Sequence, residues 1–218
     1  VAAMFSAERA CLQGGSDISF RTSALVGFGC VAKFLSDLLH LCFDPSVGWR
    51  LTIVWSSLNC QGALVHAATS LLLQIECAAL SLNAQMVSEQ GTRAAHSDAL
   101  KALSAARQRW QFVLVSDLVL SMPAIALMAL DGYVGTRNGS WLDVTESISS
   151  MGYASAMLLA QILPLANYNG VVHQVDICTA DFAMFQLLRR MPLHWTTLGV
   201  TIDAARFKGF VISAAGAM

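Results

Sequence analysis

Five ionisable residues lie within apolar stretches of this sequence, where a charge is costly unless it has a partner. They are Lys33, Asp37, His66, Glu76 and Asp117. Such groups at membrane depth indicate an ion or substrate pathway, a proton relay or a structural ion pair. Lys33 and Asp37 are four residues apart, so on a helix they share a face and neutralise each other. For Asp117, a polar contact within a helix bundle and a functional role both remain open.

No catalytic or metal-binding motif accompanies these groups. His66 and Glu76 are ten residues apart, which is not a spacing that places two metal ligands on one helix face. The six cysteines form no CxxC pair, and no nucleophile motif or phosphate-binding loop is present. We therefore expect a protein that is not an enzyme and that has no catalytic residue, no metal and no cofactor.

The composition predicts whether these groups lie in water or in a lipid bilayer. The chain has 218 residues, of which 56% are hydrophobic and 12% are charged, with a net charge of −1. The mean hydropathy is +0.57. This balance excludes a disordered acidic tail and a basic nucleic-acid binder. Long runs of Ala, Leu, Ser and Met favour helices, so the sequence predicts an all-α, polytopic transmembrane bundle in a lipid bilayer, with no nucleic-acid partner.

Segments poor in charge predict about five membrane spans in a single transmembrane domain over 1–218. The expected spans lie near 22–43, 51–82, 110–131, 147–168 and 201–218. The connection 83–109 is polar with helical spacing of its apolar residues, which predicts that the spans extend into water there. The connection 171–195 predicts a short helix that ends before Pro192. We expect 131–146 to form a loop.

The distribution of Lys and Arg predicts the orientation. Connection 83–109 holds four such residues and connection 171–195 holds Arg189 and Arg190, whereas the opposite side has Arg50 and Arg137. Cytoplasmic loops carry the excess of Lys and Arg, so both connections are expected in the cytoplasm. The sequon that begins at Asn138 would then face outside, where glycosylation takes place.

A pattern near the end of the chain resembles a known family. Phe182, Gln186, Leu187 and Leu188 form an F…QLL pattern, and the stretch 199–203 reads Gly-Val-Thr-Ile-Asp. This is similar to the last intracellular helix and the entry to the seventh span of insect gustatory receptors and gustatory receptor-like proteins. The similarity covers spans three to seven of that family. Because two earlier spans and the closing signature of the family have no counterpart, we expect a fragment of a seven-helix protein.

The resemblance implies a chemoreceptor-like, ligand-gated cation channel subunit, truncated, that forms a homo- or heterotetramer, binds a small organic ligand and takes part in signal transduction at the plasma membrane. It implies that the pore helix begins near Asp203, with pore or packing positions at Phe207, Phe210, Val211, Ala214 and Met218. It implies a ligand pocket in the outer half of the bundle, near Phe43, Trp55, Asn59, Met122, Met151, Tyr153 and Met157.

Two other classes remain open from the sequence. A structural helical subunit of a larger membrane complex needs only packed spans, and a transporter would use Lys33, Asp37 and Asp117 within its spans. The cytoplasmic connections distinguish these classes from a receptor. If the chain is receptor-like, 83–109 and 171–195 are expected to pack together as an intracellular anchoring bundle, and separated connections would weaken that interpretation.

Overall fold

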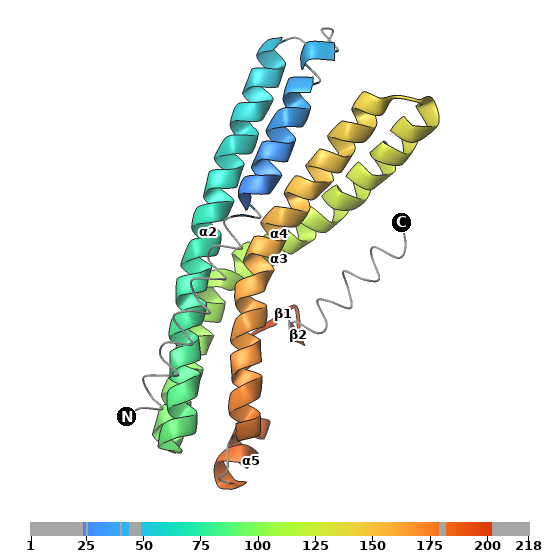
Figure 1. The fold of residues 1–218 in the computed structure, drawn as a ribbon. Helices are drawn as coiled ribbons and strands as arrows, with labels where there is room; N and C mark the ends of the chain where they lie inside the picture. Colours follow the sequence, from blue (N-terminus) through green and yellow to red (C-terminus); the bar gives the residue numbers. More distant parts are fainter. Residues whose placement is uncertain (1–23, 25, 40, 44–48, 179–181, 202–218) are drawn as a thin grey trace. The chain divides into compact units, whose positions relative to one another are not determined.

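The computed structural model describes residue 24 and residues 26–39, 41–43, 49–178 and 182–201. Within this part of the chain the regular structure is helical apart from one short hairpin of two strands, as Figure 1 shows. The predicted all-α class is therefore confirmed. The predicted span at 201–218 lies outside the described residues except for Thr201, which belongs to a strand.

Long helices account for most of the described chain. A first helical stretch covers Val26–Phe43. It is followed by α2 at Trp49–Gln90, α3 at Arg93–Asn138 and α4 at Trp141–Cys178. These three have 42, 46 and 38 residues, well beyond the roughly 20 that a membrane span needs. Four helices of the described part are long and apolar enough to cross a membrane.

The turn between α2 and α3 explains why the predicted connection 83–109 is helical almost throughout. Helix α2 ends at Gln90, and Gly91, the next residue, has a φ of +58°, the left-handed conformation that favours glycine after a helix. Thr92 then begins α3 by accepting, at its hydroxyl oxygen, a hydrogen bond of 3.2 Å from the backbone N–H of Ala95. The prediction of helices that extend beyond the apolar segments is confirmed for this connection.

The turn between α3 and α4 is shorter than the sequence suggested. We expected a loop over 131–146, but only Gly139 and Ser140 interrupt the helices. Gly139 has a φ of +70°, and the Ser140 hydroxyl accepts a hydrogen bond of 3.4 Å from the backbone N–H of Asp143. The two helices approach each other closely beside this turn because Gly135 has no side chain. A Cβ atom at that position would lie only 3.0 Å from the Cβ of Asp143.

The segment after α4 contains a short helix and the hairpin. Helix α5 covers Phe182–Arg190 and ends before Pro192, as the sequence predicted. Strands β1 (Thr196–Thr197) and β2 (Val200–Thr201) pair in an antiparallel register. The two residues between them have positive φ, +53° at Leu198 and +75° at Gly199, which matches the turn type preferred in tight hairpins. This hairpin was not predicted from the sequence, where 171–195 was expected to hold a short helix and 201–218 a span.

The chain divides into two compact units. Unit 1 comprises Val1–Leu71 and Ser116–Gln161, and unit 2 comprises Leu72–Val115 and Ile162–Met218. The apolar core of unit 1 is small and is formed by Val26, Ala63, Met157 and Ala160. The core of unit 2 is larger and centres on fully buried side chains that include Leu73, Leu103, Leu165, Leu193 and Trp195.

Candidate functional site

A buried ion pair lies at the centre of the candidate site in unit 1. The ammonium Nζ of Lys33 is 2.7 Å from Oδ1 of Asp37, and the two residues are only 5% and 6% exposed. They belong to one helical stretch with a spacing of four residues, so their predicted pairing is confirmed. Burial of two charges side by side is tolerated because each is the counter-ion of the other.

Two further helices supply partners to this pair. The hydroxyl of Ser56 on α2 donates a hydrogen bond of 2.9 Å to Oδ2 of Asp37, so both oxygens of that carboxylate are bonded. From α4, Oε1 of Glu146 lies 3.6 Å from Nζ of Lys33. Lys33 is therefore placed between two carboxylates. The sequence could not reveal this arrangement, because neither Ser56 nor Glu146 is close to Lys33 along the chain.

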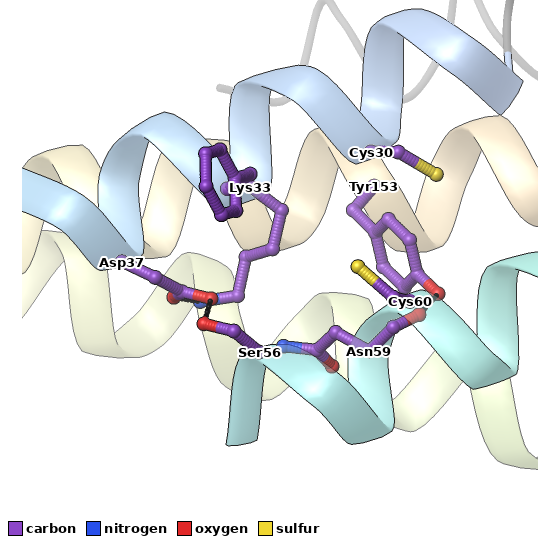
Figure 2. Close-up of a pocket in the computed structure, with 8 residues that line it drawn as sticks. Cys30, Lys33, Asp37, Ser56, Asn59, Cys60 and Tyr153 are labelled. Carbon is purple, nitrogen blue, oxygen red and sulfur yellow. Dashed lines mark hydrogen bonds and ion pairs between the residues drawn. The ribbon is translucent and has the colours of Figure 1, made fainter. Parts of the chain in front are cut away.

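A small pocket opens beside the ion pair, as Figure 2 shows. Its empty space is about 230 Å³, including the part that is open to the surroundings. The enclosed cavity within this space is only about 10 Å³, roughly the room that one water molecule needs. Its wall combines charged, polar, thiol and aromatic groups, from Cys30, Lys33, Phe34, Asp37, Ser56, Asn59, Cys60 and Tyr153.

Two of the seven residues predicted to line a ligand pocket, Asn59 and Tyr153, lie together at this pocket. The hydroxyl of Tyr153 on α4 donates a hydrogen bond of 3.0 Å to the backbone oxygen of Asn59 on α2. The side-chain nitrogen Nδ2 of Asn59 is buried and has no hydrogen-bond partner within the described structure. A buried amide that lacks a partner is costly, so a bound water or polar solute in this pocket would stabilise it.

The other five predicted ligand residues do not line the pocket. Met157 is 4% exposed and belongs to the apolar core of unit 1, while Met151 is partly buried. Phe43 packs edge-on against Trp141 with a distance of 5.4 Å between ring centroids, and it remains exposed. Trp55 and Met122 are exposed as well. Their hydrophobicity, which suggested a ligand pocket, is equally typical of surfaces that face lipid.

The third intramembrane residue predicted to matter, Asp117, lies apart from this pocket. Its Oδ2 is 3.9 Å from Nδ1 of His66, and the two side chains are 21% and 32% exposed. Helix α3 provides the carboxylate and α2 the imidazole. The sequence showed both residues within apolar segments but gave no sign that they meet, since they are far apart along the chain.

Unit 2 brings the two predicted cytoplasmic connections together. Ala99, Leu103 and Ala106 of connection 83–109 share one apolar cluster with residues of connection 171–195. The latter contribute Val172, Val175, Met184, Leu188, Leu193 and Trp195. Connections 83–109 and 171–195 therefore pack together in unit 2.

Polar contacts fix the segment between α5 and the hairpin within this bundle. Asn169 on α4 bonds both backbone groups of Trp195: its Nδ2 donates to the carbonyl oxygen at 3.0 Å, and its Oδ1 accepts from the N–H at 2.6 Å. The guanidinium of Arg107 donates to the backbone oxygen of His194, and Nε2 of His194 lies 3.1 Å from Oδ2 of Asp176. Burial lowers the pKa of Arg107, and the neighbouring Tyr168 opposes that shift.

Some predicted sites lie beyond the described residues. Asp203, Phe207, Phe210, Val211, Ala214 and Met218, the pore positions implied by the family resemblance, all belong to 202–218. Within 24, 26–39, 41–43, 49–178 and 182–201, no group of three or more His, Cys, Asp or Glu side chains is arranged to hold a metal ion. Comparison with protein-family models, curated proteins and solved structures finds no match to the chain.

Proposed function

We propose that the chain is a multi-pass integral membrane protein, with connections 83–109 and 171–195 in the cytoplasm. The observation that supports this most directly is the surface of α3, whose most apolar stretch of 18 residues is only 6% buried. Large apolar side chains face outward there, including Phe112 at 80% exposure and Leu120 at 69%. In water such a surface would drive aggregation, whereas in a bilayer lipid covers it.

The two tight helix turns provide a matched test of this topology. Expression of the full chain with eukaryotic microsomes should give a glycosylated species at the natural sequon of Asn138, detected as a shift in gel mobility that Asn138→Gln removes. The substitution Gln90→Asn creates the equivalent sequon in the α2–α3 turn, because Gly91 and Thr92 follow it. On the Asn138→Gln background this engineered site should stay unmodified, since it faces the cytoplasm.

The reverse result, with the engineered site modified and Asn138 unmodified, would invert the proposed orientation. Modification of both sites would show that α3 does not cross the membrane between them. Extraction of the unmodified chain from microsomes at alkaline pH would contradict membrane integration altogether.

Within this class we propose a chemoreceptor-like, ligand-gated cation channel subunit of the gustatory receptor-like type. The observation that carries this proposal is the packing of connections 83–109 and 171–195 into one bundle in unit 2. A receptor-like chain needs such an anchor, because the segment after α5 leads directly into the span expected to line the pore. Asn169, Arg107 and Trp195 hold that segment through side-chain and backbone bonds.

The pocket in unit 1 restricts the ligand if it is the receptor site. With a cavity of about 10 Å³, it has room for about one water molecule, placed to hydrogen-bond to Asn59 or to the Lys33–Asp37 pair. A larger organic ligand would require the pocket to open further.

A receptor-like subunit is expected to assemble as a tetramer, which distinguishes it from the alternatives. Native mass spectrometry of the full chain, purified in mild detergent, should show a mass four times that of the 23.3 kDa monomer. A monomer or dimer would contradict the channel proposal. Purification in a fixed complex with other proteins would instead favour a structural subunit.

A transporter is the second candidate, and the buried pair of Lys33 and Asp37 specifically favours it. Charged pairs inside a helix bundle mark substrate and ion pathways in many transporters. A monomeric chain that exchanges a small solute across vesicle membranes, and loses that exchange when Asp117 is neutralised, would support this candidate over the channel.

A further inference from the structure

We propose that the tip of the β1–β2 hairpin in unit 2 contacts the lipids of the cytoplasmic leaflet, at the level of their headgroups and upper acyl chains. The tip presents two large apolar side chains outward, Leu198 at 62% exposure and Val200 at 54%. Helices of the same unit place the tip where the predicted spans leave the membrane. This inference rests on the multi-pass placement proposed above and not on the receptor class.

The hairpin continues an extended segment whose inward side is already used. Leu193, Trp195 and Thr197 are 1%, 1% and 4% exposed. His194 and Thr196, which lie between them, are only partly buried. This alternation is that of an extended chain with one side against a core. The residues that follow, 198–200, are all exposed, so the tip points away from the core of unit 2.

Bonds to α4 fix the depth of the extended segment. Asn169 bonds both backbone groups of Trp195, and it is the first residue after the span predicted at 147–168. Tyr168, the last residue of that span, donates a hydrogen bond of 2.5 Å to the backbone oxygen of Leu193. The hairpin therefore begins at the level where α4 leaves the predicted membrane region.

Helix α3 gives the same level independently. Arg107 donates to the backbone oxygen of His194, and it lies three residues before the span predicted at 110–131. The last predicted span, near 201–218, would begin where β2 ends at Thr201. Three predicted membrane boundaries thus meet at the hairpin.

The backbone of the tip makes an exposed leucine costly in water. Leu198 has a φ of +53°, a conformation that a bulky side chain disfavours and that glycine adopts freely. The strain comes together with exposure of the apolar side chain. Contact with lipid would remove that side chain from water and offset both costs.

Lipid suits this tip better than a protein partner does. Two apolar side chains form a much smaller surface than a standard protein interface, which buries about 800 Å² on each side. Lipid contact requires no such area, because the long apolar helices already hold the chain in the membrane.

Helix α5 provides a matched control position in the same unit. Helix α4 continues ten residues beyond 168 before it ends at Cys178, about 15 Å along its axis. Helix α5 then begins at Phe182, and its residue Gln186 is exposed. Gln186 is therefore expected in water, away from the lipid surface.

Photocrosslinking from the tip tests the inference. The photoreactive residue p-benzoylphenylalanine replaces Leu198, Val200 or Gln186 of the full chain, one at a time, and each protein is reconstituted in phosphatidylcholine vesicles. After irradiation we expect the intact mass of the Leu198 and Val200 variants to rise by one phospholipid, and the Gln186 variant to show no such adduct. Val200 keeps the test valid if the turn rejects a larger side chain, because it lies outside the two residues of positive φ. A lipid adduct at either tip position supports the inference.

A covalent dimer of the chain on a denaturing gel would overturn the inference, because the tip would then contact a second copy. Absence of a lipid adduct at both tip positions would overturn it too, as would an equal adduct at Gln186. Alkaline extraction of the same vesicles separates these results from a failure of the proposed function. A chain that stays in the membrane without a lipid adduct at its tip contradicts this inference alone, whereas an extracted chain contradicts the membrane placement itself.

Discussion

Replacement of Lys33 by methionine should lower the free energy of unfolding by about 3–5 kcal/mol, because it leaves the Asp37 carboxylate buried without its counter-ion. Ser56 alone would then bond that carboxylate. Methionine preserves most of the side-chain length, so the loss reports the charge rather than a cavity. The measurement is an unfolding titration with sodium dodecyl sulfate in mixed micelles, followed by tryptophan fluorescence.

Two controls isolate the cause. The double variant Lys33→Met/Asp37→Leu removes both charges and should recover most of the stability, as replacement of a buried pair by apolar residues often does. Lys101→Met breaks the ion pair with Asp98, in which both side chains are 75% exposed, and should cost less than about 1 kcal/mol. A Lys33→Met variant as stable as Lys101→Met would mean that water or lipid headgroups reach the pair, contrary to its burial.

Truncation of Trp195 to alanine should destabilise unit 2 by about 3–5 kcal/mol, the range seen when a buried aromatic side chain is removed from a core. Trp195 is 1% exposed and is the largest of the fully buried side chains. Its backbone is bonded on both sides to Asn169, so the surrounding chain is held open and cannot collapse into the cavity. Thermal unfolding followed by size-exclusion chromatography measures the loss.

Trp141→Ala is the matched control, since Trp141 is 54% exposed and should tolerate truncation with a loss near 1 kcal/mol or less. If the channel proposal holds, Trp195→Ala should also reduce the tetramer at temperatures where unit 1 remains folded. Equal stability losses for the two tryptophans would contradict the core position of Trp195.

The helices were predictable because their signals are local. Apolar runs longer than 20 residues, the Lys33–Asp37 spacing and the break before Pro192 each depend on residues close together in the sequence, and the structure has all three features. The tight α3–α4 turn was missed because polar residues between 131 and 146 are typical of loops. On a helix hairpin those residues can face outward while the helices continue. Only Gly139 and Ser140 interrupt the helices here.

The site was only partly predictable because it depends on contacts between distant residues. Asn59 and Tyr153 were expected near one another, but their bond joins positions on α2 and α4 that no spacing rule connects. The meetings of Ser56 with Asp37 and of Gln161 with His66 are of the same kind. Ser and Gln are common within helices, so neither residue type points to a site until the partner is placed beside it.

In the proposed orientation, the two-residue turn at Gly139 and Ser140 limits how much of the chain proteases and antibodies can reach from outside the cell. A hairpin so short presents helix ends and little free chain, so a protease added to intact cells should find few cleavable bonds there. Antibodies raised against linear peptides of this region would bind poorly for the same reason, because residues 131–146 are helical except for Gly139 and Ser140. Any recognition at this end of the chain would then have to act through side chains on helix termini, and not through the length of a loop.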